Sequence, residues 1–376
     1  MLDYKKTIEN LTREQKIALL SNAATALDGV DPVAFAPFDD DSEESSRFPS
    51  LRAVTRSWNK DLASSVASGI AEQAKAEGKN ALVLGKNLSM CNPYFDGLSE
   101  DSYLAGRMGN AFTSGTKAVN GTIGVCEIGI DNLQKTYLDE KIDVGTSYKF
   151  FVEPALSAMK GSAQCVALCE NGADNAPLMR SVVENAKRNG IVARKGLDAK
   201  QTLEAALKGE VVFGGKDDEL RKVMDAYDDL SQQVIAGRRT REELAAAVSE
   251  KKAISDDSFD EALENALKLI DYCNQDKFAP QAAAHTFAND IALLKRACTE
   301  SSVLLKNEND VLPIEKGRRV ALLGIDAEKS IGNQAFYDVF EEYCSTKGTS
   351  LWDMRLQTAT ITTLTKGQKI SAQTPT

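Results

Sequence analysis

Short apolar runs of strand-like composition alternate with longer helix-like segments over residues 61–213, and this alternation constrains the fold more than any other feature of the sequence. The helix-like segments are residues 61–77, 104–119, 148–159, 178–188 and 202–207, and the strand-like runs are residues 81–84, 122–125, 164–168, 190–193 and 211–213. Because successive strands joined through a helix lie parallel in one sheet, the pattern predicts an α/β fold with helices on the faces of a parallel sheet. The number of units favours a TIM-like (β/α)₈ barrel, complete or incomplete.

Further helices are expected on both sides of this region. Thr12 is followed three residues later by Gln15, a capping-box pattern that predicts a helix over residues 11–20. After Gly215 the pattern becomes purely helical. The expected helices are residues 220–234, 240–252 with a capping box from Thr240 to Glu243, 258–272 with a capping box from Ser258 to Glu261, and 281–306. These helices would close the barrel or wrap around it.

A polar connector separates the expected barrel domain from the start of a second domain. Residues 320–323 have strand composition and open what we expect to be a second, truncated α/β domain. We therefore expect a barrel domain with flanking helices over residues 1–306, a linker over 307–317 and the start of the second domain over 318–376. Residues 357–376 are rich in threonine and lysine without helical periodicity, which favours a flexible tail.

The charge and hydrophobicity patterns exclude two classes of partner. The 45 basic and 55 acidic residues give a net charge of −10, which would repel a phosphate backbone, so nucleic acid is not expected as a partner. Residues 1–16 lack an apolar signal core, and no run is long enough to span a bilayer. We expect a cytoplasmic protein without a membrane partner.

The histidine and cysteine content limits the chemistry. His285 is the single histidine, so a catalytic triad or a multi-histidine metal site would have to use it, and its surroundings favour a packing role. Seven cysteines without CxxC spacing argue against a disulfide framework or a zinc site. The acidic run at residues 39–44 lacks the spacing and central glycine of a calcium loop. No metal or cofactor is expected.

Four collinear stretches resemble the N-terminal barrel of the family 3 glycoside hydrolases, which include many β-glucosidases. They are LTREQKIALLS, FPSLRAVTRSWNKDLASSVASGIAEQAKAEG, LSEDSYLAG and ESSVLLKNENDVLPI, and they span residues 11–314. They resemble, in order, the opening helix of that family, its first barrel strand and helix, its Ser-Glu-Asp-Pro-Tyr-Leu-x-Gly element and the linker into its second domain. The resemblance implies a barrel that binds carbohydrate at one end.

The resemblance also implies where a site would lie and suggests that its chemistry has changed. The family nucleophile is an aspartate in a Val-Ser-Asp-Trp context, and in the corresponding run here the position falls on Arg194. A guanidinium cannot attack an anomeric carbon. The sugar-gripping Lys-His pair of the family corresponds to Cys126 and Glu127, and Asp39 is the candidate for its sugar-binding aspartate. The substrate-binding candidates are therefore Asp39, Cys126, Glu127 and Arg194.

Two functions remain open at this point. One is a catalytically impaired relative that acts as a binding or regulatory protein, with Arg194 either contacting a ligand or salt-bridged inside a filled pocket. The other is an active glycoside hydrolase that uses relocated carboxylates, with Glu127, Glu170 and Asp131 as candidates, or a site completed by another chain. The expected partners are a carbohydrate ligand and either a second copy of the chain or a partner chain, which would cover the short second domain.

Overall fold

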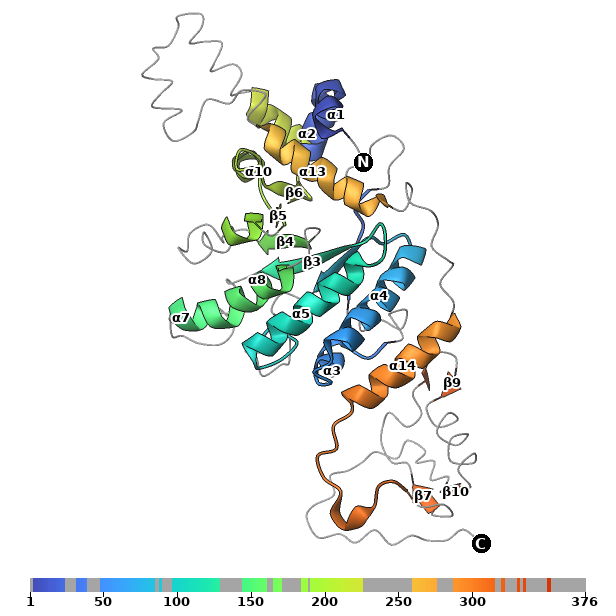
Figure 1. Ribbon diagram of the computed structural model, residues 1–376. Coiled ribbons are helices and arrows are strands. Elements are labelled where there is room, and N and C mark those ends of the chain that lie inside the picture. The colour runs from blue at the N-terminus through green and yellow to red at the C-terminus, as the bar shows by residue number, and fades with distance from the viewer. Residues whose placement is uncertain are drawn as a thin grey trace, which may run out of the picture. The chain divides into compact units, whose positions relative to one another are not determined.

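The computed structural model of the chain describes residues 3–23, 32–38, 48–84, 88–89, 97–128, 144–160, 165–170, 184–188, 190–225, 259–275, 287–314, 319–321, 330–331, 334–335 and 350–352. The chain divides into two compact units, Met1–Val303 and Leu304–Thr376. The larger unit contains a parallel sheet with helices packed on it (Figure 1).

The sheet has six parallel strands whose order in space is their order in the chain. The strands are β1 (Phe35–Pro37), β2 (Ala81–Leu84), β3 (Ile123–Ile128), β4 (Cys165–Glu170), β5 (Ile191–Lys195) and β6 (Val211–Phe213). The order never reverses along the sheet. This single winding is that of a (β/α)₈ barrel, whereas a doubly wound sheet reverses its order at a switch point.

Alternate residues of the strands belong to two separate hydrophobic clusters. One cluster contains Ala81, Ile123, Val125, Ile191, Ala193, Val211 and Phe213, together with side chains of the helices near the two ends of the larger unit. The other contains Leu82, Leu84, Cys126 and Val192, together with side chains of the crossover helices. Successive side chains of a strand point to opposite faces. In β2, β3, β5 and β6, odd-numbered positions therefore line one face, called here the inner face, and even-numbered positions line the other, called the helix face.

The sheet is curved strongly enough to bring its first and last strands into contact. The ring centroids of Phe35 in β1 and Phe213 in β6 lie 4.8 Å apart, with the rings at 86° to each other. In a flat sheet of this width the same strands would be roughly 24 Å apart, given a spacing of about 4.8 Å between neighbours. The six strands therefore form a barrel-like sheet. Backbone pairing between β1 and β6 is not among the interactions of the described residues, so a complete barrel is not demonstrated.

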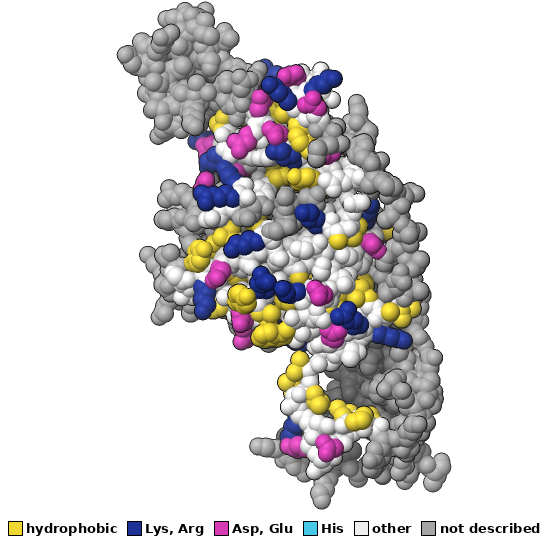
Figure 2. All heavy atoms as spheres, viewed as in Figure 1, with side chains coloured by type: hydrophobic (Ala, Val, Ile, Leu, Met, Phe, Trp, Pro, Cys, Tyr) yellow, Lys and Arg dark blue, Asp and Glu magenta, His cyan; other side chains and the backbone are white. Residues whose placement is uncertain are grey.

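The helix face is covered by helices packed side by side (Figure 1). They are α3 (Leu51–Thr55), α4 (Lys60–Ala76), α5 (Ser102–Lys117) and α8 (Glu153–Met159), the last preceded by α7 (Val144–Ser147) and the π-helical η1 (Tyr148–Val152). Contact between α4 and α5 is close at Gly115, where an added Cβ would lie 2.1 Å from the carbonyl oxygen of Ser64. On the face of the molecule shown in Figure 2, acidic and basic side chains are interspersed.

A second group of helices packs around the inner-face cluster: α1 (Tyr4–Asn10), α2 (Arg13–Ser21), α10 (Ala199–Ala206) and α13 (Asp260–Cys273). The Thr12 and Gln15 capping box is present at the start of α2. After α2, the amide of Ala23 donates to the carbonyl of Val212 in β6 at 2.8 Å. The Tyr4 hydroxyl donates to the buried Asp271 carboxylate at 2.8 Å, and this bond links α1 to α13.

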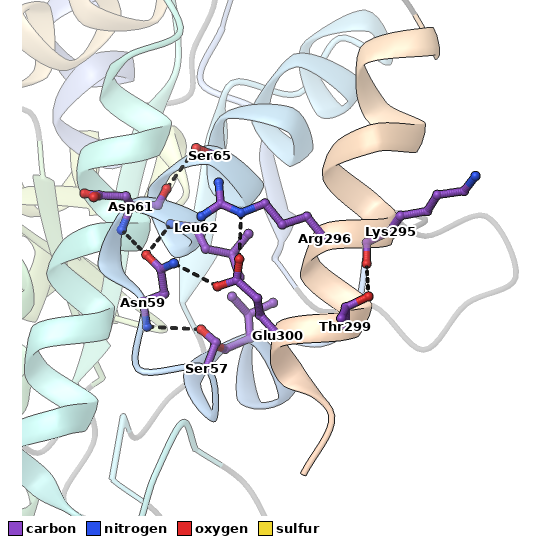
Figure 3. A network of polar contacts seen from close by, with 10 residues as sticks. Ser57, Asn59, Asp61, Leu62, Ser65, Lys295, Arg296, Thr299 and Glu300 are labelled. Atoms are coloured by element: carbon purple, nitrogen blue, oxygen red, sulfur yellow. Dashed lines mark hydrogen bonds and ion pairs between the residues drawn. The ribbon is translucent and has the colours of Figure 1, made fainter. Parts of the chain in front are cut away.

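The last helix of the larger unit, α14 (Phe287–Ser301), packs against α3 and α4 and is joined to them by a polar network (Figure 3). Asn59 caps α4 by accepting from the amides of Asp61 and Leu62. The side-chain amide of Asn59 donates to Glu300 at 2.8 Å, and Nε of Arg296 donates to the same carboxylate at 2.7 Å. A single asparagine thus begins α4 and holds the end of α14.

The smaller unit contains short strands in its described residues. Strand β7 (Arg319–Ala321) pairs in parallel with β10 (Ser350–Trp352), and β8 (Ser330–Ile331) pairs antiparallel with β9 (Gln334–Ala335). They follow the 3₁₀ turn η5 (Glu308–Asp310). Around this turn the side-chain amide of Asn307 both donates to the carbonyl of Leu312 and accepts from its amide, each at 2.9 Å.

Several sequence expectations are confirmed and others are corrected. The runs at 81–84 and 211–213 are β2 and β6, and β3, β4 and β5 include most of their predicted residues. The helix expected over 281–306 ends at Ser301, and residues 302–306 are not helical. Helix α13 has Phe259 as its N-cap, without a side-chain hydrogen bond, instead of the expected Ser258 capping box. The helix expected over 240–252 lies outside the described residues.

Candidate functional site at the carboxyl end of the sheet

The carboxyl ends of the parallel strands bring two oppositely charged side chains together on the inner face. Glu127 lies near the end of β3, and Lys195 is the last residue of β5. The ammonium group of Lys195 forms an ion pair with Oε1 of Glu127. The side chain of Glu127 is 8% exposed and that of Lys195 is 36% exposed. A nearly buried carboxylate is therefore matched by a cation that solvent can reach.

The strand register explains how residues of β3 and β5 meet across the strand between them. Glu127 lies opposite Leu168 of β4, and Leu168 lies opposite Ala193 of β5. Lys195 is two residues beyond Ala193, so it points to the same face as Ala193 and Glu127. A four-carbon side chain then reaches diagonally over β4 to the carboxylate. The carboxyl end of a parallel sheet is where proteins of this architecture hold their ligands.

Arg194, next to Lys195, points to the helix face and forms a separate ion pair. Its Nε donates to Oε2 of Glu210 at 2.8 Å, and the two side chains are 4% and 2% exposed. Nζ of Lys187, in the helix at residues 184–188, lies 3.6 Å from Oε1 of Glu210 and donates to the carbonyl of Lys208 at 2.8 Å. Glu210 is thus a buried carboxylate that faces two cations.

Two of the substrate-binding candidates, Arg194 and Cys126, lie on the face opposite to Glu127. Cys126 is buried in the helix-face cluster. The physical reason is strand alternation: Cys126 and Glu127 are neighbours, as are Arg194 and Lys195, so one member of each pair faces inward and the other faces the helices. Arg194 is a salt-bridged, buried residue, which was one of the two alternatives that the sequence left open.

The other candidates are placed only in part. Glu170 ends β4, and its backbone lies in register with Lys195. Asp39 and Asp131 lie outside the described residues. Lys195 is not among the candidates that the sequence analysis named. The signal was available in the run Ile191-Val192-Ala193-Arg194-Lys195, because Ile191 and Ala193 are the inward apolar positions and Lys195 continues their alternation.

The chemistry open to this site follows from the pair. A carboxylate already bonded to an ammonium group is neutralised and a poorer proton acceptor or nucleophile than an isolated carboxylate. An exposed ammonium offers donors to hydroxyl or carboxylate oxygens of a ligand. Among the described residues, no group of three or more histidine, cysteine, aspartate or glutamate side chains could hold a metal ion. The described helices include none with the length and hydrophobicity needed to cross a membrane.

Comparisons with known proteins give a consistent relationship. No protein-family model matches the chain. Thermostable beta-glucosidase B of Acetivibrio thermocellus is 26% identical over 298 residues, covering 75% of this chain and 36% of that protein. Probable beta-glucosidase I of Emericella nidulans is 26% identical over 364 residues, covering 87% of this chain and 40% of that protein. The chain therefore spans less than half the length of these relatives.

Solved structures show the same architecture. The GH3 beta-glucosidase of Bifidobacterium adolescentis superposes with a TM-score of 0.66 at 18% identity, over 94% of this chain and 54% of that one. Beta-glucosidase 3B of Thermotoga neapolitana, in complex with glycerol, gives a TM-score of 0.63 at 18% identity, over 94% and 55% of the two chains. At this identity the likeness establishes the fold alone.

Proposed function

We propose that this chain, which is a relative of the family 3 β-glucosidases, binds a carbohydrate at the carboxyl end of its sheet without cleaving it and acts as a binding or regulatory protein. The observation that carries the proposal is the ion pair between Lys195 and Glu127. Glycosidic cleavage passes through an oxocarbenium-like transition state that carboxylates stabilise. A lysine cation at the inner face opposes that charge and neutralises the carboxylate beside it.

The same pair suits binding. Sugars present many hydroxyl oxygens, and an ammonium group donates up to three hydrogen bonds. The side chain of Lys195 is 36% exposed and therefore borders solvent, while its ammonium group pairs with Glu127. The names of the relatives point to β-glucosides as the first ligands to test.

The test measures hydrolysis and binding on the same full chain. We expect no turnover of aryl β-glucosides or aryl β-N-acetylglucosaminides above a buffer control, and heat on titration with glucose or a β-glucoside. Lys195→Ala should weaken that binding at least several-fold, whereas Lys200→Ala, at an exposed position five residues away, should not. Turnover by the wild-type chain, or binding that is indifferent to Lys195, would overturn the proposal.

A second candidate function is an active glycoside hydrolase with relocated carboxylates, and the strand register supports it. Glu170 ends the strand next to Glu127, two residues beyond the position opposite Glu127. Their Cα atoms are therefore roughly 8 Å apart, from the usual spacings along and between strands. Glycosidases use a pair of carboxyl groups, and these two strand positions are close enough to supply one. Turnover that is abolished by Glu127→Gln and by Glu170→Gln, but kept by the exposed-site variant Glu219→Gln, would favour this function.

A further inference from the structure

The buried pair on the helix face lies next in sequence to the cation of the proposed site. Arg194 and Glu210 are 4% and 2% exposed in their side chains and are joined at 2.8 Å. The backbone of Glu210 is itself fixed, because its amide donates to the carbonyl of Ala205 at 3.0 Å, at the end of α10. Glu210 is therefore a carboxylate with a fixed backbone that pairs with Arg194, near the end of β5.

Strand geometry couples this anchor to Lys195. Consecutive residues of a strand point to opposite faces, so a slip of one residue moves every side chain to the other face. If β5 slipped, Lys195 would face Glu210 and Arg194 would face Glu127. Both alternative pairs are oppositely charged, so charge alone does not exclude the slipped register. The guanidinium of Arg194 distinguishes the two because its planar fork is a better partner than an ammonium for a buried carboxylate.

We infer that Glu210 is a positioning residue for the proposed site: by holding Arg194 on the helix face, it directs Lys195 toward Glu127 on the inner face. Lys187 contributes a second cation, with Nζ 3.6 Å from the other oxygen of Glu210. The carboxylate is therefore held at both of its oxygens. The ligand-binding role of Lys195 rests on the proposed function, whereas the positioning of Lys195 does not.

The test measures the reactivity of Lys195 in the full chain and needs no carbohydrate. The chain is acetylated with a limiting amount of an amine-selective reagent and digested with a protease that does not cut at lysine. The modified fraction of Lys195 is then compared with that of exposed Lys200 by mass spectrometry. Lys195 should react more slowly than Lys200 in the wild type. Glu127→Gln should raise the Lys195 rate several-fold, because the ammonium group loses the opposite charge that favours its protonated form.

The decisive variant removes the anchor without leaving a buried charge. The double variant Arg194→Met with Glu210→Leu replaces the pair with apolar side chains, which buried pairs often tolerate. We expect it to keep the thermal midpoint of the wild type while the Lys195 rate rises several-fold and the Lys200 rate stays constant. Arg194→Lys, which keeps a cation, should retain most of the protection, and Glu219→Gln should retain all of it.

An unchanged Lys195 rate in the folded double variant would overturn the inference. An equal rise at Lys195 and Lys200 would also overturn it, since that result indicates general loosening. If the double variant does not fold, Glu210→Gln provides the same comparison. A chain that binds no sugar but behaves as expected in this test would refute the proposed function and leave the positioning role standing.

Discussion

Arg194 and Lys195 are adjacent cations that perform different tasks because the strand sends them to opposite faces. Arg194 ends in a buried, nearly dry pair with Glu210, where the guanidinium needs its carboxylate. Lys195 pairs with Glu127, and in this pair the Glu127 side chain is nearly buried whereas the Lys195 side chain is 36% exposed. The role of a charged residue at the end of a strand can therefore be assigned only after it is known which face of the sheet its side chain lies on.

Replacing Arg194 with aspartate should destabilise the chain without creating a hydrolase. Arg194→Asp would place a second carboxylate beside Glu210 on the helix face, with Glu210 already 2% exposed. Breaking a buried pair in this way costs about 3–5 kcal/mol in free energy of unfolding. Urea denaturation measures the loss, and an aryl β-glucoside assay should still read zero. Lys216→Asp is the control, because Lys216 is 75% exposed in its pair with Glu219 and should change stability far less. A gain of activity from Arg194→Asp would show that this position reaches the substrate.

For single residues, the sequence predicts which segment supplies the proposed site better than it predicts the direction of each side chain. The resemblance led to the segment 191–196, and that segment does supply the cation of the proposed site. It placed Arg194 there because an alignment counts residues, whereas the side-chain direction depends on a period of two. Glu210 carried no signal in the sequence, since its role depends on pairing with a residue sixteen positions away.

Among the elements, those with strong periodicity or capping were predicted and those without were missed. The capping box at Thr12 and the apolar run of β2 are local signals, and both are confirmed. Strand β1 is three residues long and contains Pro37, so the sequence shows no alternation of apolar and polar residues there. The strand is the first in the sheet order, and an edge strand is where proline is tolerated. Helix α13 begins without its expected capping box because its burial in the inner-face cluster holds it in place.

The bond between α1 and α13 should make stability fall at alkaline pH. Burial, then the hydrogen bond to Asp271 and its charge, raise the pKa of Tyr4 above its ordinary value of 10.0. The unfolded chain therefore loses its tyrosine proton at a lower pH than the folded chain. The stabilisation is present below about pH 10 and is lost as pH rises further.

Tyr4→Phe tests this link directly. It should cost about 1–3 kcal/mol at neutral pH, because the buried Asp271 carboxylate loses a donor, and it should remove this contribution to the alkaline decline. Urea denaturation at pH 7 and above pH 10 measures both effects. Tyr103→Phe is the matched control, because Tyr103 is 69% exposed. Parallel pH curves for wild type and Tyr4→Phe would contradict the prediction.

The attachment of α14 should weaken in acid. The hydrogen bond from Arg296, and then that from Asn59, lower the pKa of Glu300 below its ordinary value of 4.5. The contribution of Glu300 is therefore fully present above that value and is lost as pH falls below it. Glu300→Gln should speed amide hydrogen exchange in α14 at neutral pH but leave α13 unchanged. Glu264→Gln, which breaks an exposed pair with Lys268 on α13, is the control. Equal exchange in α14 of both variants would show that the bond between Asn59 and Glu300 does not anchor this helix.

For the whole molecule, the alternation of helices and strands predicted a parallel sheet, which the structure confirms, whereas the complete (β/α)₈ barrel that the number of units favoured stays a prediction. Local periodicity specifies that strands are parallel and which residues are apolar, whereas curvature depends on how many strands join and how their twist accumulates. The similarity to β-glucosidases and the fold agree with each other, and the proposed site lies at the end of the sheet where this architecture holds its ligands. The cytoplasmic location and the second copy or partner chain stay predictions.

The contact that reports closure is the pair Phe35 and Phe213, which joins the first and last strands of the sheet order. If the curved sheet is a property of the folded chain, the two rings should be energetically coupled although they lie far apart in the sequence. A double-mutant cycle with Phe35→Leu and Phe213→Leu, followed by urea denaturation, should give a coupling free energy of about 0.5–1.5 kcal/mol, the usual worth of an edge-to-face aromatic pair. The cycle of Phe213→Leu with Phe112→Leu is the control, because Phe112 packs in the helix-face cluster and its substitution should add independently. Additive costs for Phe35 and Phe213 would mean that the sheet edges do not meet in solution, and the carboxyl end would then be an open edge and not an enclosed mouth.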